Sequence, residues 1–351
     1  MRELAPRTPF GALCLFVLSA IPCLAQTDSL QATRAGETWV LSTSGPSARI
    51  ETPAGQSLSF GLPAASEISS FVALDHGWAL AGSVQDPGDG GRRRLFLMTG
   101  GDTGAPRALA EPAGQSGPER RFPVLLADGG KLAGLAWLEG NDVGSFTVRA
   151  AAWTGRRFRA PEAVSQPGPG SQMGLSGAVL GDGSWLLAWS AFDGVDNEIV
   201  WSRRLGGQLD GHWLPARPVS TDNAVPDITP AVVATRGGAL LAWSRYEEEG
   251  YRLRLVRFEG GEWREERAGG PSGSLYPSWT AGADRPQLLY FTALPRGWVA
   301  AELDGSGKTV REAAVVAPYA ERPAIVGSGE NVEMRWPARR KEAAAAWRVT
   351  Q

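Results

Sequence analysis

The chain has 351 residues, a formal net charge of −2, and 43% apolar residues. This apolar content is enough to build a folded core, which excludes a wholly disordered chain. The near-neutral charge excludes a strongly basic nucleic-acid-binding protein, so we expect no nucleic-acid partner. The 45 glycines and 25 prolines argue against a helical bundle, because both residue types are costly inside helices.

The N-terminus, Met1–Ala25, is typical of a secretory signal peptide. Arg2 and Arg7 supply positive charge ahead of the apolar stretch Phe10–Leu18, and the range ends in small residues that suit cleavage. We therefore expect an exported protein, either periplasmic or extracellular. The alternative is a lipoprotein acylated at Cys23, but the proline before this cysteine argues against it.

Residues 26–351 are expected to form a single domain. Both cysteines, Cys14 and Cys23, lie within the signal peptide, so the mature chain has neither disulfides nor thiol-based sites. No later apolar run reaches the roughly 18 residues that a membrane helix needs. The mature domain is thus predicted to have no membrane span.

The strongest internal signal is a repeat that carries a tryptophan at a fixed position. Trp137, Trp189 and Trp243 end similar apolar segments, at spacings of 52 and 54 residues. Self-similarity at such a period is the signature of a repeat architecture. Seven segments share this register: Thr38–Thr43, His76–Ser83, Gly129–Trp137, Gly181–Ser190, Arg236–Ser244, Gln287–Thr292 and Asn331–Trp336.

Each repeat is expected to contain four short strands. In the clearest copy these are Ile228–Thr235, Ala239–Tyr246, Tyr251–Phe258 and Glu262–Arg267, with glycine pairs at the turns. The second strand is apolar at successive positions and the fourth is charged, as expected for the inner and outer strands of a blade. The sequence therefore predicts an all-β β-propeller of four-stranded blades, with its repeat tryptophans packed between blades.

Seven blades are predicted, with six as the alternative if the short first copy is an appendage. The last copy has room for only three strands before the chain ends at Gln351. We therefore expect residues near 26–33 to supply its fourth strand and close the ring.

The segment Glu198–Ser244 resembles the BNR, or Asp-box, repeat of the sialidase superfamily. The turn Asp210–Trp213 (DGHW) keeps the aspartate, glycine and tryptophan of that repeat, and proline-led strands follow in the same order. The resemblance implies a propeller in which such turns are structural and lie opposite the binding face. It also implies exo-glycosidase chemistry where the family's catalytic residues are present. The Arg-Ile-Pro signature of sialidases has only a counterpart with a displaced proline here, Arg49–Pro53 (RIETP).

In four-stranded blades, the second-to-third and blade-to-blade connections open on one face, which is the binding face in this superfamily. The ligand-binding candidates on these connections are Arg121, Asp193, Asp196, Asp227, Arg245, Tyr246 and Arg322. If the protein is an enzyme, the resemblance implies Tyr276 as nucleophile, assisted by Glu248. The three candidate arginines, Arg121, Arg245 and Arg322, would then bind a substrate carboxylate, because a planar guanidinium group can form two hydrogen bonds to it.

Metal and cofactor sites have little support. His76 and His212, the only histidines, each adjoin a turn glycine. Asp193–Glu198 is rich in oxygen ligands but lacks the length of an EF-hand loop. We therefore predict no metal and no cofactor.

We expect an exported, monomeric propeller that binds a glycan or protein ligand. The alternative is an exo-glycoside hydrolase of sialidase type. A purely structural envelope protein is a third possibility.

Overall fold

A computed structural model describes most of the chain from residue 29 onward. The described residues are 29–34, 37–86, 88, 91–103, 105–112, 117–140, 145–207, 209–220, 223–281, 285–316, 322–326, 331–336, 341–346 and 348–349. The predicted signal peptide lies outside these residues. Regular structure in the described ranges consists of strands alone, and no helix there is long and apolar enough to cross a membrane.

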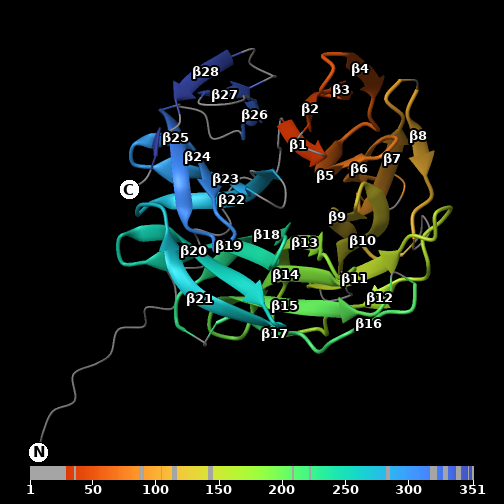
Figure 1. Ribbon diagram of the computed structural model, residues 1–351. Helices are drawn as coiled ribbons and strands as arrows, with labels where there is room; N and C mark the ends of the chain where they lie inside the picture. Colours follow the sequence, from red (N-terminus) through yellow and green to blue (C-terminus); the bar gives the residue numbers. More distant parts are fainter. Residues whose placement is uncertain are drawn as a thin grey trace, which may run out of the picture.

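The strands form seven antiparallel sheets arranged around a common axis, which confirms the predicted β-propeller (Figure 1). Blade 1 contains β1 (Ser29–Arg34), β2 (Glu37–Ser44), β3 (Ser47–Glu51) and β4 (Ser57–Gly61). Blade 2 contains β5 (Ser66–Leu74), β6 (Gly77–Gln85), β7 (Arg93–Gly100) and β8 (Arg107–Leu109). Blade 3 contains β9 (Arg120–Asp128), β10 (Lys131–Gly140), β11 (Phe146–Ala152) and β12 (Glu162–Ala163).

The second half of the ring follows the same order. Blade 4 contains β13 (Gln172–Val179), β14 (Trp185–Phe192), β15 (Asn197–Leu205), β16 (His212–Trp213) and β17 (Arg217–Pro218). Blade 5 contains β18 (Asp227–Thr235), β19 (Gly238–Glu247), β20 (Gly250–Glu259) and β21 (Glu262–Gly269). Blade 6 contains β22 (Ser274–Ala281), β23 (Gln287–Ala293), β24 (Arg296–Leu303), β25 (Thr309–Val316) and, paired with β25, β29 (Arg348–Val349). The seventh sheet, here called the C-terminal sheet, contains β26 (Ala324–Val326), β27 (Asn331–Trp336) and β28 (Lys341–Ala346).

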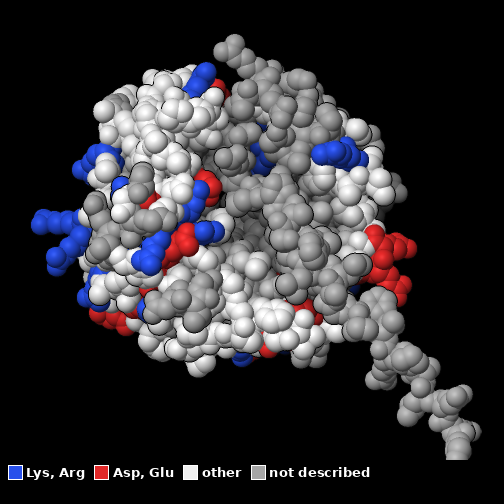
Figure 2. Space-filling model, turned by 180° about the vertical axis from the view of Figure 1, so that it is seen from behind, with Lys and Arg blue, Asp and Glu red and all other residues white. Residues whose placement is uncertain are grey.

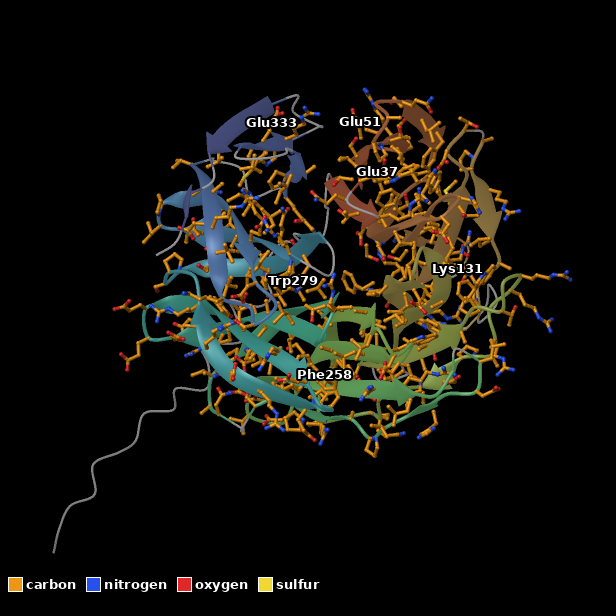
Figure 3. The ribbon with its side chains drawn as sticks, in the orientation of Figure 1. Glu37, Glu51, Lys131, Phe258, Trp279 and Glu333 are labelled. Atoms are coloured by element: carbon orange, nitrogen blue, oxygen red, sulfur yellow. The ribbon has the colours of Figure 1, made fainter. Side chains whose placement is uncertain are left out.

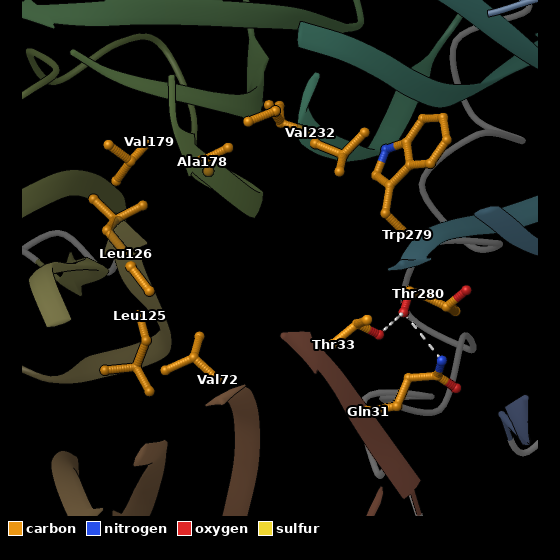
Figure 4. A pocket seen from close by; sticks show the side chains of 14 residues that line it. Gln31, Thr33, Val72, Leu125, Leu126, Ala178, Val179, Val232, Trp279 and Thr280 are labelled. Carbon is orange, nitrogen blue, oxygen red and sulfur yellow. Dashed lines mark hydrogen bonds between the residues drawn. The ribbon is translucent and has the colours of Figure 1, made fainter. Parts of the chain in front are cut away.

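The prediction of seven four-stranded blades was wrong: six blades have four or more strands, and the C-terminal sheet has three in the described residues. The predicted closure by the N-terminal strand was also wrong, because β1 pairs with β2 from Ser29–Ser42 to Arg34–Glu37. Pairing across this short connection costs less chain entropy than pairing with the far end of the chain. A central cavity of about 270 Å³ is lined by the first strands of the six blades alone (Figure 4).

Hydrophobic clusters join each sheet to the next. Trp137, Trp189 and Trp243 are at most 1% exposed, and each packs in a cluster with residues of the preceding blade. This confirms that the repeat tryptophans are inter-blade packing residues. In blade 2, Gly82 occupies the position that the repeat tryptophan has in blades 3, 4 and 5. A Cβ atom at Gly82 would lie 2.6 Å from the ring of Phe96. The phenylalanine ring therefore takes the space that tryptophan fills elsewhere.

Polar contacts close the ring between blade 1 and its neighbours. The six clusters of described residues lie between consecutive sheets, and none of them joins the C-terminal sheet to blade 1. Instead, Gln31 Nε2 donates to the carbonyl of Thr280 at 3.1 Å, and its Oε1 accepts from the amide of Ile325 at 2.7 Å. Thr33 Oγ1 donates to the same Thr280 carbonyl at 3.0 Å (Figure 4). One glutamine on β1 thus connects β22 and β26.

Replacing Gln31 by alanine is expected to lower the free energy of unfolding by about 1–3 kcal/mol, because two backbone groups at the closure lose a partner. Urea denaturation followed by tryptophan fluorescence measures this loss. The exposed Gln56 provides the control, and its replacement by alanine is expected to change stability by less than about 0.5 kcal/mol. Equal effects of the two substitutions would show that the Gln31 contacts do not hold the ring closed.

Candidate functional site

The first strands of several blades begin with a bulge on one face of the ring, here called the mouth face. Phe122, Thr229 and Tyr276 have φ values of 49°, 54° and 55°, and each precedes a proline. The strand register shifts at these points. Positive φ is uncommon for residues other than glycine, and bulges redirect side chains. Phe122 and Tyr276 accordingly pack against inter-blade clusters.

Three buried carboxylates, Asp196, Glu198 and Asp227, lie on the mouth face at the junction of blades 4 and 5. Asp196 ends the β14–β15 turn, Glu198 is the second residue of β15, and Asp227 begins β18. Their exposures are 7%, 4% and 0%. The junction is held together by Ser190 Oγ, which donates to the Asp227 carbonyl at 2.7 Å. We call these three residues, with Arg245 and Asn223, the carboxylate cluster.

The β14–β15 turn is shaped by Asp193. Its Oδ1 accepts the amides of Val195 at 2.7 Å and Asp196 at 3.1 Å. Gly194 adopts a φ of 117° between them, a conformation open to glycine. Asp193 itself is exposed, and this local hydrogen bonding directs Asp196 inward.

Arg245 neutralises Asp227 through a bidentate ion pair. Its Nε lies 2.8 Å from Asp227 Oδ1, and its Nη2 lies 2.7 Å from Oδ2. Nη1 donates to Glu266 at 2.7 Å, and Nη2 also donates to Ser220 at 3.1 Å. The hydrogen bond to Asp227 raises the pKa of the Arg245 guanidinium despite its burial. The bidentate geometry fixes the positions of both side chains at one side of the cluster.

Glu198 is held by one carboxylate oxygen only. Its Oε1 accepts the backbone amide of Asn223 at 3.2 Å and the Asn223 Nδ2 at 2.8 Å. The same Nδ2 lies 3.5 Å from Asp227 Oδ2, so one amide group bridges the two carboxylates. Within the described residues, Glu198 Oε2 and the neighbouring Asn197 Oδ1 receive no hydrogen bond although both are buried.

Burial is the main cause that raises the pKa of Glu198 to about 7, and the nearby negative charges of Asp227 and Asp196 add to it. Near neutral pH this carboxyl group is therefore present in both protonation states. It can accept a hydrogen bond at Oε2 when ionised and donate one when protonated. These properties suit recognition of hydroxyl groups, and they also suit proton transfer.

The structure brings together three of the predicted site residues: Asp196, Asp227 and Arg245. Tyr246 lies beside them, because its amide donates to the Pro226 carbonyl at 2.9 Å. Its ring is 45% exposed and packs edge-on against Tyr251 at 5.3 Å. The fifth predicted residue in this region, Asp193, supports the β14–β15 turn through its hydrogen bonds to Val195 and Asp196.

The other predicted arginines belong to other sheets. Arg121, on β9, pairs with Glu119 at 2.6 Å and stacks over Phe146. Arg322 precedes β26, and burial lowers its pKa to about 10. Arg121 and Arg245 are thus each engaged by a carboxylate of the protein.

The predicted Tyr276–Glu248 pair is not joined by any contact between described residues. Tyr276 packs against the cluster between blade 6 and the C-terminal sheet, and burial raises its pKa. Glu248 is exposed in the β19–β20 turn of blade 5. A raised pKa is the opposite of what an activated nucleophile needs, so this geometry does not favour the tyrosine mechanism.

Glu198, Asn223, Ser220 and Glu266 were not among the predicted site residues. Glu198 heads a strand that is otherwise apolar in its first half (EIVW) and follows Asp196 by two residues. The sequence signal that could have revealed Glu198 was a glutamate directly before an apolar run and two residues after another acidic residue, Asp196. Asn223 lies in an irregular connection with no pattern to reveal it.

The described residues contain no group of three or more His, Asp or Glu side chains arranged to hold a metal ion.

The charged side chains of both signs are interspersed over the described part of the face in Figure 2. Toward the centre of the ring, Trp279 of β22 lies beside the central cavity, whereas Lys131 lies farther out in blade 3 (Figure 3).

Comparisons with known proteins support the fold. No family model matches the chain, and no curated protein matches it in sequence. The polysaccharide lyase Uly1 is similar in structure, with a TM-score of 0.56 and 9% identity, over 93% of this chain and 90% of the lyase. A thermostable family-43 glycoside hydrolase is similar at a TM-score of 0.42 and 13% identity, over 78% of this chain and 94% of the hydrolase.

TolB from Acinetobacter baumannii is similar at a TM-score of 0.44 and 14% identity, over 71% of this chain. The chain spans 56% of the length of TolB. At these identities the similarity to Uly1 shows a shared propeller architecture. No family model, that of the BNR repeat included, matches the chain.

Proposed function

We propose that the protein is a binding propeller whose mouth face holds a glycan at the carboxylate cluster. The observation that supports this most directly is the buried Glu198 Oε2, which has no hydrogen-bond partner among the described residues. A buried acceptor without a partner is costly. A ligand hydroxyl that donates to this oxygen would remove the cost.

A hydroxyl-rich ligand fits the surroundings of this oxygen. The preceding residue of β15, Asn197, carries a second buried acceptor without a hydrogen-bond partner among the described residues, its Oδ1. The Tyr246 backbone lies beside the cluster, where its amide donates to the Pro226 carbonyl at 2.9 Å. A few fixed polar groups that converge on one point are what orients a ligand in a small-molecule site. The Asp227–Arg245 pair, held by two hydrogen bonds, would present fixed polar groups to the ligand.

Export, a single domain over 26–351 and a monomeric state are part of this proposal. They are inferred from the predicted signal peptide and the continuous repeat. The similarity to a polysaccharide lyase and a glycoside hydrolase is consistent with a glycan ligand but is no argument for one.

Hydrolysis of the bound glycan is the second candidate function. A carboxyl group with a pKa of about 7 close to a second carboxyl group has the properties of a glycosidase acid/base. In that case Glu198 would transfer the proton, in place of the Tyr276 chemistry that a sialidase would use.

A glycan microarray probed with the labelled protein tests the proposal. We expect binding to a subset of glycans, and a loss of affinity of about 10-fold or more in Glu198→Ala, because a hydrogen bond to a charged group is removed. The control is Glu51→Ala, which removes an exposed carboxylate on blade 1 and is expected to leave binding unchanged. Incubating the bound glycans and measuring new reducing ends separates hydrolysis from binding. An array without signal, or equal binding by Glu198→Ala, would contradict the proposal.

A further inference from the structure

A groove of about 530 Å³ lies between blades 2 and 3, on the face opposite the mouth. It is bordered by the β5–β6 turn and the β9–β10 turn, which follow the ends of the first strands of these blades. Its volume is within the range of ligand sites in proteins. The carboxylate cluster lies at the other end of such strands, so the two sites are separate.

A direct backbone contact builds the groove. The amide of Asp75, in the β5–β6 turn, donates to the carbonyl of Gly130 in the β9–β10 turn at 2.7 Å. Gly130 has a φ of 82°, and a Cβ atom there would lie 2.1 Å from Asp75 Oδ1. Glycine is therefore required at this point, and the two turns form one continuous wall.

The floor of the groove is apolar. Leu74, Leu109 and Trp153 are half-buried and border the groove, together with the buried Leu132. Leu209 reaches in from the β15–β16 connection of blade 4 and is 39% exposed. Apolar surface collected in a concave site is a feature of binding surfaces.

The rim of the groove is cationic. Arg107 and Lys131 border it, and both are exposed. Neither forms an ion pair with another described residue. Among the described residues that line the groove, Asp75 is the single acidic one. The complement of this surface is an apolar group flanked by negative charges.

We propose that this groove binds an acidic peptide segment of a partner protein, with an apolar side chain of the segment on the leucine floor and its carboxylates on Arg107 and Lys131. Four leucines and Trp153 form the apolar part of the lining. The Trp153 ring packs edge-on against Phe158 at 4.8 Å, so the aliphatic side chains provide most of the surface for an apolar side chain of the peptide.

A displayed library of random peptides, panned on the full-length protein, tests this proposal. Counter-selection uses the double variant Arg107→Glu and Lys131→Glu, whose substitutions are exposed and leave the core intact. We expect enriched sequences in which acidic residues flank a large apolar residue. The synthesised consensus peptide should lose at least about 10-fold in affinity for the double variant in fluorescence polarisation.

Three controls make the result specific. Arg296→Glu with Lys308→Glu gives the same change in net charge at exposed positions of blade 6 and should leave affinity unchanged. Leu209→Ala should weaken binding, whereas Glu198→Ala should not, because the carboxylate cluster is a separate site. Failure to enrich acidic peptides, or unchanged affinity of the double variant, would overturn the proposal. Binding of oligogalacturonate that the double variant loses, without any peptide binding, would overturn it in favour of an acidic glycan.

Discussion

Replacing Asp227 by alanine is expected to lower the free energy of unfolding by about 3–5 kcal/mol and to abolish ligand binding at the carboxylate cluster. Asp227 is completely buried and makes both hydrogen bonds of a bidentate pair with Arg245, whose side chain is 13% exposed. Removing one partner of a buried pair leaves the other charge uncompensated, which is strongly destabilising. In the described residues the guanidinium would keep its hydrogen bonds to Glu266 and Ser220 and its place over the Trp243 ring.

Urea denaturation at pH 7, followed by circular dichroism, measures the effect. Glu262→Ala is the matched control, because it removes a carboxylate from an exposed pair with Arg217. Such pairs contribute about 0–1 kcal/mol. If Asp227→Ala does not fold, Asp227→Asn provides the comparison, with a smaller loss expected. A loss no larger than that of Glu262→Ala would refute a structural role for the buried pair.

Replacing Glu198 by glutamine is expected to stabilise the protein by up to about 3 kcal/mol at pH 8 and to have little effect at pH 4.5. The pKa of Glu198 is about 7 in the folded protein, against an ordinary value of 4.5. Between these values the folded state holds a proton that the unfolded state has released, so the contribution of Glu198 to stability falls as pH rises. This contribution is fully present below about pH 4.5 and is lost above about pH 7.

Urea denaturation of both proteins from pH 4.5 to 8.5 measures this difference, because all other titrating groups are shared. Glu248→Gln is the control, since it makes the same substitution at a side chain that is exposed in a turn, and a smaller stabilisation than that of Glu198→Gln is expected at pH 8. A Glu198→Gln difference that stays constant over the same interval would show that the Glu198 carboxyl is not perturbed by its surroundings.

Much of the fold could be predicted from the sequence because each blade repeats a local pattern. The expected strands of the clearest copy lie within β18, β19, β20 and β21. The fully buried Trp243 confirms the inner position of the second strand. These features follow from apolar spacing and turn glycines, which every repeat carries in its own sequence.

The number of blades depends on contacts that no local pattern contains. Pairing of β1 with β2 and of β29 with β25 decides which sheets are complete. The strand bulges also depend on the assembled ring. A proline marks each bulge in the sequence, but the positive φ of Tyr276 and the packing of its side chain between sheets arise only when the sheets pack together. Tyr276 was predicted on the mouth face from its place before a proline, whereas its half-buried packing between blade 6 and the C-terminal sheet depends on contacts between sheets.

The candidate site was predictable in part. Asp196 lies in a connection, and Asp227 and Arg245 lie at strand ends, that the blade topology places on one face. Glu198 was missed because its unusual property, a buried carboxylate oxygen without a partner among the described residues, exists only once blades 4 and 5 have packed together.

Hydrogen–deuterium exchange of the full-length protein, with and without the glycan that binds most strongly on the array, tests the proposed site most directly. We predict slower exchange of backbone amides in residues 193–198 and 223–228, where the two blades meet, and no change at the β5–β6 and β9–β10 turns. Protection confined to other blades, or no protection at all under saturating glycan, would contradict a binding site at the carboxylate cluster.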